Sequence, residues 1–126
     1  MKSLGKHVIL EVHGANKNLL NDLEKIEKIM TKAVQLCGAT IIKPFFHQFS
    51  PHGISGVIVI AESHFSIHTW PEYGYAALDL FTCGDQIKPE DAVNYLKKEL
   101  NAEHIHMMEI KRGTLDIPPE ELKHKQ

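Results

Sequence analysis

Two spacings of apolar residues run along this chain, and together they divide it into strands and helices. Short runs that alternate or stay apolar, are rich in β-branched and aromatic residues and end at turn residues predict strands. Six segments have this character: residues 7–13, 40–49, 54–61, 64–70, 75–82 and 104–110. They supply enough strand for one sheet.

Two further segments place apolar residues three and four positions apart, which is the spacing of one helix face. The first predicted helix begins near Asn16 or Asn18, either of which can cap it, and ends at Gly38. Its apolar face consists of Leu19, Leu23, Ile26, Met30, Ala33 and Cys37. The second helix begins at Pro89, a residue suited to the first helical position, and turns inward Ala92, Val93, Leu96 and Leu100.

The predicted elements follow one another as β-α-β-β-β-β-α-β, mostly through hairpin-like connections. This order predicts an α+β fold, a two-layer sandwich whose antiparallel sheet carries two helices on one face, with residues 1–126 as a single domain. The other face also needs a cover, because aromatic residues occupy both faces of one strand (Phe45, Phe46 and Phe49). We therefore expect a homodimer. From Arg112 onward the polar sequence predicts a loose tail.

Composition narrows the class of protein. The 126 residues are 43% hydrophobic and 24% charged, as in ordinary globular proteins, and a net charge of −2 lacks the basic surplus of nucleic-acid binders. The longest apolar run, residues 57–61, is far below the ~18 residues of a membrane helix. No apolar stretch resembling a secretory signal follows Met1, so we expect a cytoplasmic protein with Cys37 and Cys83 as free thiols.

The most unusual stretch is ESHFSIHTWPEYGY, residues 62–75, in which histidines, serines, carboxylates and aromatic rings are crowded together. If its strand is extended, Phe65 and Ile67 point to one face. The opposite face then receives Ser66, His68 and Trp70. One side of this strand is therefore suited to the core and the other to chemistry.

Ser63 lies at the corner between two predicted strands, where its hydroxyl can attack the carbonyl of Glu62 and convert the peptide into an ester. Removal of the Ser63 α-hydrogen then expels the Glu62 carboxylate, and hydrolysis leaves a pyruvoyl group and ammonia. These steps need a base and an oxyanion donor, for which His68 and Ser55 are suited. From a serine and a histidine alone, a turn serine and an ordinary strand histidine are the commoner explanation.

The motifs around Ser63 favour the self-cleavage interpretation over an ordinary turn serine. ESH at residues 62–64, SIHTWPE at 66–72, DLFTCG at 79–84 and GISG at 53–56 resemble the small prokaryotic S-adenosylmethionine decarboxylases, and the similarity covers roughly residues 3–112. The resemblance implies cleavage between Glu62 and Ser63, giving a β chain of residues 1–62 and an α chain of residues 63–126. Ser63 becomes a covalent pyruvoyl cofactor that forms a Schiff base with the substrate.

The same resemblance assigns roles to individual residues. His68 is the proton acceptor in processing, Ser55 supports the processing intermediate and Cys83 is the proton donor in catalysis. A thiol is mostly protonated at neutral pH, so it can donate without special tuning. The expected reaction converts S-adenosylmethionine to the aminopropyl donor of spermidine biosynthesis, in a homodimer of αβ protomers.

The substrate carries a sulfonium cation and an adenine ring, and aromatic faces attract both. Phe49 and Trp70 are the candidates, with the resemblance favouring Phe49 for adenine and Glu72 for the ribose hydroxyls. For Trp70, a place in the core or in a dimer interface is equally compatible with the sequence.

Three other functions compete with this interpretation. The pairs His64/His68 and His104/His106 could bind zinc, but the chain has no CxxC or HExxH motif, so no metal site is expected. A non-catalytic homodimer could use its aromatic face to bind a partner, and would stay uncleaved. A pyruvoyl-dependent decarboxylase of arginine or another basic amino acid would keep Ser63, His68 and Cys83 and differ in its pocket.

Overall fold

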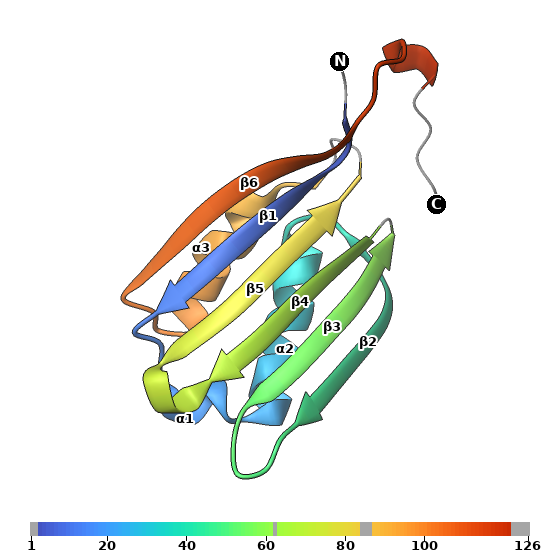
Figure 1. The fold of residues 1–126 in the computed structure, drawn as a ribbon. Coiled ribbons are helices and arrows are strands. Elements are labelled where there is room, and N and C mark those ends of the chain that lie inside the picture. The colour runs from blue at the N-terminus through green and yellow to red at the C-terminus, as the bar shows by residue number, and fades with distance from the viewer. Residues whose placement is uncertain (1–2, 62, 84–86, 122–126) are drawn as a thin grey trace.

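The computed structural model, which describes residues 3–61, 63–83 and 87–121, is a two-layer α+β sandwich (Figure 1). The elements in chain order are β1 (Ser3–His13), α1 (Lys17–Leu20), α2 (Leu23–Leu36), β2 (Thr40–Gln48), β3 (Ile54–Ala61), β4 (Ser63–Trp70), β5 (Tyr75–Thr82), α3 (Pro89–Glu99) and β6 (His104–Thr114). The strands form one sheet in the order β2-β3-β4-β5-β1-β6, and every neighbouring pair is antiparallel. The fold predicted from the sequence is confirmed.

The first predicted helix is split in two, which corrects the sequence analysis. The Asn16 side chain accepts a hydrogen bond from the Leu19 amide at the start of α1, and that helix ends after one turn at Asn21. The Asp22 side chain then caps α2 by accepting from the Lys25 amide. Because Asx side chains satisfy free amides at helix starts, a second cap inside the apolar pattern begins a new helix.

The core lies between the sheet and its helices. Figure 1 shows α2 and α3 on the same face of the sheet. The fully buried residues of β4 are Phe65 and Ile67, and those of α2 include Ile26 and Met30. Alternation along β4 therefore directs Phe65 and Ile67 to the helices, as predicted.

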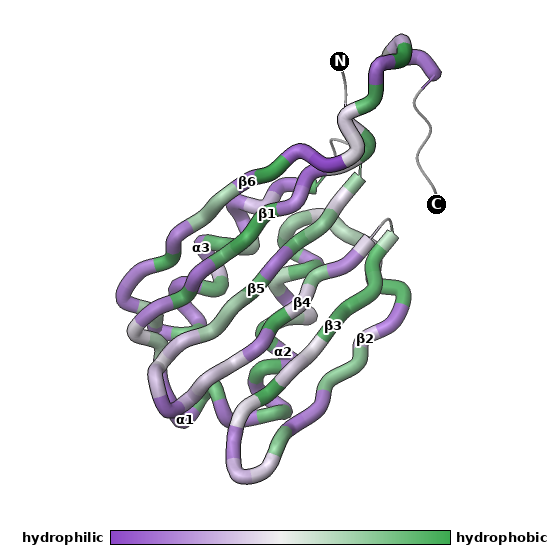
Figure 2. The backbone as a smooth tube through the Cα atoms, in the orientation of Figure 1, coloured by the Kyte–Doolittle hydropathy of each residue, from purple (hydrophilic) through white to green (hydrophobic). Residues whose placement is uncertain are grey.

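The opposite face of the sheet is covered by no described element, and we call it the open face. Hydrophobic and hydrophilic residues are interspersed along its strands (Figure 2). Large apolar side chains on this face remain exposed, namely Phe45, Val59, Met108 and Ile110. A sheet face of this character is suited to contact with another protein surface.

β6 extends beyond the predicted strand. It continues to Thr114, and Pro119–Glu121 forms a short 3-10 helix, so the expectation of a loose tail from Arg112 is wrong for these residues. Pairing with β1 explains the difference, because Ser3 lies opposite Thr114 and Gly5 opposite Arg112. Across the described ranges, no helix has the length and hydropathy required to cross a membrane.

Candidate active site

Ser63 and Cys83 meet at one end of the open face. Ser63 is the first residue of β4 and lies opposite Thr82 on β5, which places Cys83 one residue further along. The Ser63 Oγ and Cys83 Sγ atoms are 3.7 Å apart, a hydrogen bond in which either can donate. Both side chains are partly exposed, so the serine hydroxyl and the thiol are together accessible.

The backbone at Ser63 is strained. Its φ angle is 149°, in a region that residues other than glycine rarely adopt. Such conformations cost on the order of 1–3 kcal/mol and gather at functional sites. The peptide that would have to break is therefore attached to a residue held in an unfavourable conformation. Glu62 itself lies outside the described residues.

A hollow of about 780 Å³ opens beside this pair, and we call it the serine hollow. It is lined by Leu4, Val57, Val59, Ser63, His64, Ser66, Phe81, Cys83, Arg112 and Gly113. Most of the surface in contact with it is apolar, and its polar side chains are those of Ser63, His64, Ser66, Cys83 and Arg112. A small organic substrate fits a hollow of this size.

Ser55 and His68 form a second pair, nearer the other end of β4. The two residues lie opposite each other on β3 and β4, and the Ser55 Oγ is 2.8 Å from Nδ1 of His68. The hydrogen bond fixes the orientation of the imidazole and leaves Nε2 free of this contact. Sequence reasoning predicted both residues, and the structure brings them together.

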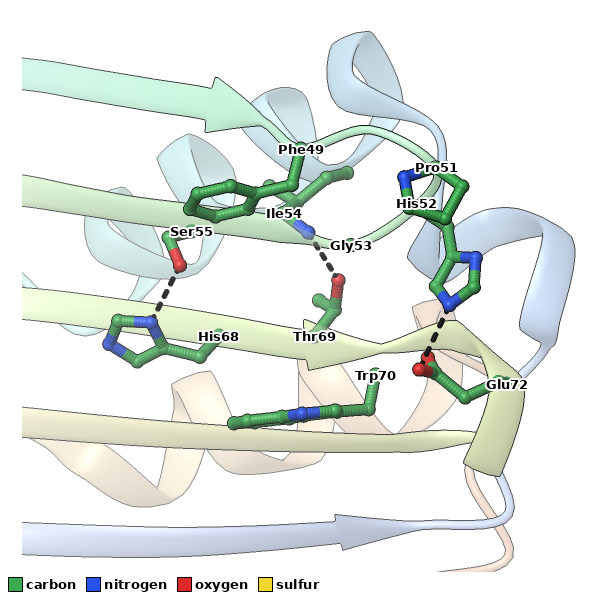
Figure 3. A pocket seen from close by; sticks show the side chains of 10 residues that line it. All are labelled: Phe49, Pro51, His52, Gly53, Ile54, Ser55, His68, Thr69, Trp70 and Glu72. Carbon is green, nitrogen blue, oxygen red and sulfur yellow. Dashed lines mark hydrogen bonds and ion pairs between the residues drawn. The ribbon is translucent and has the colours of Figure 1, made fainter.

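A second hollow, of about 360 Å³, adjoins this pair and contains the predicted substrate contacts (Figure 3). We call it the aromatic hollow; its lining includes Phe49, Ser55, His68, Trp70 and Glu72. Phe49 and Trp70 are both exposed, and Figure 3 shows the Phe49 ring toward the Ser55 end of the Ser55–His68 bond and the Trp70 ring toward its His68 end. The three residues predicted to bind the nucleoside therefore share one hollow with His68.

Glu72 has a partner that the sequence did not reveal. Nε2 of His52 lies 2.9 Å from a Glu72 carboxylate oxygen. A hydrogen bond from its own backbone amide and the one from His52 lower the pKa of Glu72. The carboxylate is thus ionised and able to accept hydrogen bonds at neutral pH, but a ligand there competes with His52.

The two halves of the site do not meet within one chain. His68 is five residues beyond Ser63 on the extended strand β4, a separation of about 16 Å at about 3.3 Å per residue. A base must lie within about 3 Å of the proton that it removes, or act through one water. A third hollow, lined by Val57, Ser66 and His68 among others, lies between the two ends.

A polar network that sequence reasoning missed adjoins the serine hollow, which three of its members, Ser66, His64 and Arg112, help to line. Asp79 accepts hydrogen bonds from Ser66, from Nε2 of His64 at 2.9 Å and from Nε2 of His7 at 2.6 Å. Arg112 donates to Nδ1 of His7 at 3.1 Å. Burial raises the pKa of Asp79, but the bonds from Ser66, His64 and His7 outweigh it and lower that pKa below its ordinary value.

Comparisons with known proteins identify the family of this chain. The family model for S-adenosylmethionine decarboxylase matches residues 6–113. An S-adenosylmethionine decarboxylase proenzyme of Thermosipho melanesiensis is 53% identical over 99% of this chain and 98% of its own. One from the archaeon Methanococcus maripaludis is also 53% identical, over 92% and 95%. The crystal structure of the adenosylmethionine decarboxylase from Aquifex aeolicus superimposes with a TM-score of 0.84 at 37% identity, covering 92% of this chain and 96% of that one.

Fold and site together define a two-layer sandwich with a strained serine, a thiol and an oriented histidine on its open face. The chain belongs to the S-adenosylmethionine decarboxylase family. The resemblance seen in the sequence motifs is thereby confirmed. The alternative of an arginine-type decarboxylase is not favoured, because these relatives are named S-adenosylmethionine decarboxylases.

Proposed function

We propose that this protein decarboxylates S-adenosylmethionine for spermidine synthesis with a pyruvoyl group that it makes from Ser63. The observation that carries the proposal is the strained Ser63, 3.7 Å from the Cys83 thiol beside an open hollow, in a chain of this family. The relatives are called proenzymes, which accords with a chain made whole and then cleaved.

Maturation begins at Ser63. Its Oγ attacks the carbonyl carbon of Glu62, the amide C–N bond breaks, and residues 1–62 become attached to Ser63 through an ester. A base removes the Ser63 α-hydrogen, and the Cβ–O bond then breaks and releases the Glu62 carboxylate. The dehydroalanine that remains takes the imine form, and water replaces its nitrogen as ammonia. The strain at Ser63 favours the first step.

The base is His68 of a partner subunit. Within one chain the imidazole is about 16 Å from Ser63, too far to reach the α-hydrogen. Two copies that pack open face to open face, with their β4 strands running in opposite directions, place His68 of each copy near Ser63 of the other. The Ser55 hydroxyl that orients His68 travels with it and suits the oxyanion of the first step.

The character of the open face supports this homodimer. Phe45 is 66% exposed and Met108 is 60% exposed, on opposite edges of the sheet. Removing exposed apolar surface from water stabilises an assembly by about 25 cal/mol per Å². Face-to-face packing of two sheets is a common arrangement, with the sheets about 10 Å apart. The mature protein is accordingly a homodimer of αβ protomers.

The site has residues suited to a pyruvoyl group and its substrate. When present, the group supplies a carbonyl electron sink for the electrons left as carbon dioxide departs. Ser63 provides the group itself, and the neighbouring Cys83 Sγ holds the proton that is delivered afterwards. Phe49 and Trp70 provide faces for the sulfonium and adenine, and Glu72 accepts from the ribose hydroxyls.

A cytoplasmic location fits the thiols. Cys37 and Cys83 are both free, and Cys83 can serve as a proton donor only while it stays reduced. Cys37 is buried, and that burial raises the pKa of its thiol, so it stays protonated and inert.

Intact mass spectrometry tests the proposal. The purified protein is expected as two polypeptides, residues 1–62 and a fragment that begins with a pyruvoyl group at position 63. Borohydride added with S-adenosylmethionine should increase the mass of the second fragment by the reduced substrate adduct. An active preparation consisting only of the unbroken chain would overturn the proposal.

A further inference from the structure

Three imidazoles that the proposed reaction does not use meet at the other end of the open face. His13 ends β1 and lies directly opposite His104, the first residue of β6, while His106 follows two positions along the same face. The ring centroids are 5.1 Å apart for His13–His104, 5.7 Å for His13–His106 and 4.9 Å for His104–His106. We call these three residues the histidine triad.

Each ring of the histidine triad offers a nitrogen toward the others. One ring nitrogen of each residue lies within 4.8 Å of the corresponding atoms of the other two. Within the described ranges, none of the three imidazoles forms a hydrogen bond with another side chain or with the backbone; the nearest aromatic neighbour is Tyr75, 5.3 Å from His13. The nitrogen lone pairs therefore converge on a small space without a partner.

Zinc binds in such places. Three histidines and one open position form a common tetrahedral zinc site with Zn–N distances of about 2.0–2.1 Å, which requires the nitrogens to be about 3.3 Å apart. His104 and His106 are exposed, so changes in their side-chain torsions can bring the nitrogens together. Glu11 lies opposite His106 in the β1–β6 pair and adds a negative charge that favours a cation.

We propose that the histidine triad binds one divalent cation of the zinc class, with three imidazole ligands and a fourth position that the triad does not fill. Cobalt, nickel and copper ions suit the same donors. None of the three residues lines the serine hollow or the aromatic hollow. The site is also separate from His7, His64 and Asp79, the other group of convergent ligands, whose atoms already bond to one another.

The bound cation would join the end of β1 to the start of β6. These strands meet at one edge of the sheet, and β6 has no further neighbour there among the described strands. A cation that binds only the folded chain stabilises it in proportion to its concentration above the dissociation constant. The inference does not depend on the proposed reaction, because binding and unfolding can be measured without substrate.

The test is a zinc chloride titration of untagged, chelator-treated protein by calorimetry, together with thermal unfolding with and without Zn²⁺. We expect one equivalent per chain with a micromolar or lower Kd, and a rise in Tm of several degrees at excess metal. Cobalt chloride should give the intense visible bands of a tetrahedral site.

Two variants locate the metal. His106→Ala removes one exposed ligand, and should weaken Zn²⁺ binding at least about tenfold and abolish the rise in Tm. His64→Ala is the matched control, because it removes one donor from the other group and leaves the histidine triad intact, so its Zn²⁺ affinity should equal that of the wild type. Binding unchanged in His106→Ala, binding lost in His64→Ala alone, or no binding below millimolar Zn²⁺ would each overturn the proposal.

Discussion

The Ser55 hydroxyl and the His68 imidazole are joined by a 2.8 Å hydrogen bond across β3 and β4. The bond orients the proposed base, which would not reach the α-hydrogen of Ser63 in its own chain, because Ser63 is at the far end of the same strand. Ser63 is in turn beside Cys83, and the histidine that lines the same hollow, His64, has its Nε2 bonded to Asp79. In the proposed homodimer, the Ser63–Cys83 pair of one chain and the Ser55–His68 pair of the other chain form one site.

Replacement of the reactive hydroxyl gives the first prediction. Ser63→Ala should remain a single uncleaved chain without decarboxylase activity, because no oxygen is available for the attack on Glu62. Denaturing electrophoresis and release of labelled carbon dioxide measure the two effects. Ser3→Ala, on β1 and outside both hollows, is the control and should be cleaved normally. Activity in Ser63→Ala would refute the cofactor assignment.

The division of the site between two chains can be tested by co-expression. His68→Ala alone should be cleaved slowly or not at all. When it is co-expressed with Ser63→Ala, a mixed dimer contains one site with an intact Ser63 and an intact His68, on different chains. The His68→Ala chain should then be cleaved and the Ser63→Ala chain should not. If each variant stays uncleaved in the mixture, His68 does not act across the dimer.

Substitution of Cys83 should leave cleavage of the chain intact but lower its decarboxylase activity. Cys83→Ala retains Ser63 and the processing residues, so the chain should be cleaved. Its kcat should fall about 10²- to 10⁴-fold, the range for loss of a proton donor. Cys37→Ala, at the other cysteine, is buried in the core and should affect stability more than turnover. Normal kcat in Cys83→Ala would remove Cys83 from the reaction.

Asp79 should make the free energy of unfolding depend on pH in the acidic range. Its pKa is lower in the folded chain than the ordinary value of 3.8, so the folded state binds this proton more weakly than the unfolded state. The stabilisation is fully present above about pH 4 and is lost as the pH falls through the folded-state pKa. Urea midpoints for wild type and Asp79→Asn should therefore differ most at neutral pH and converge in acid. A constant difference from pH 3 to 7 would contradict this role.

The aromatic hollow should govern substrate affinity. Phe49→Ala should raise KM for S-adenosylmethionine about 2- to 30-fold, which corresponds to about 0.5–2 kcal/mol of lost ring contact. kcat should change less, because the proposed contact of Phe49 is with the adenine ring and not with the atoms that react. Phe49→Tyr keeps an aromatic face and should retain a nearly normal KM. An unchanged KM in Phe49→Ala would place the adenine elsewhere.

Much of the fold could be read from local patterns. The alternation at Phe65 and Ile67 and the helix start at Pro89 are properties of single segments, and both were predicted. The break between α1 and α2 was missed because the apolar spacing continues past it, while the cap at Asp22 acts within three residues. A local side-chain bond there prevails over a longer periodic pattern.

The candidate site could be predicted only where its residues lie in one segment of the sequence. The Asp79 network was missed because it joins His7 to a residue 72 positions away and to Arg112, 105 positions away, through the placement of β1 between β5 and β6. Strand order of this kind is not encoded in a local pattern. The distance between Ser63 and His68, in contrast, follows from the extension of a single strand. It can be calculated from the sequence with the rise per residue of a β-strand.

The proposed break between residues 62 and 63 falls in the connection from β3 to β4. In the sheet order, the amino-terminal piece supplies β2, β3 and β1, and the other supplies β4, β5 and β6. β1 of the amino-terminal fragment therefore pairs on both sides with strands of the other fragment, β5 and β6, so strands of the two fragments are interleaved in one sheet. Cleavage of the backbone between β3 and β4 would therefore leave the two fragments held together until the protein unfolds. The uncleaved and the cleaved protein would have the same folded shape, and the two fragments would separate only on denaturation.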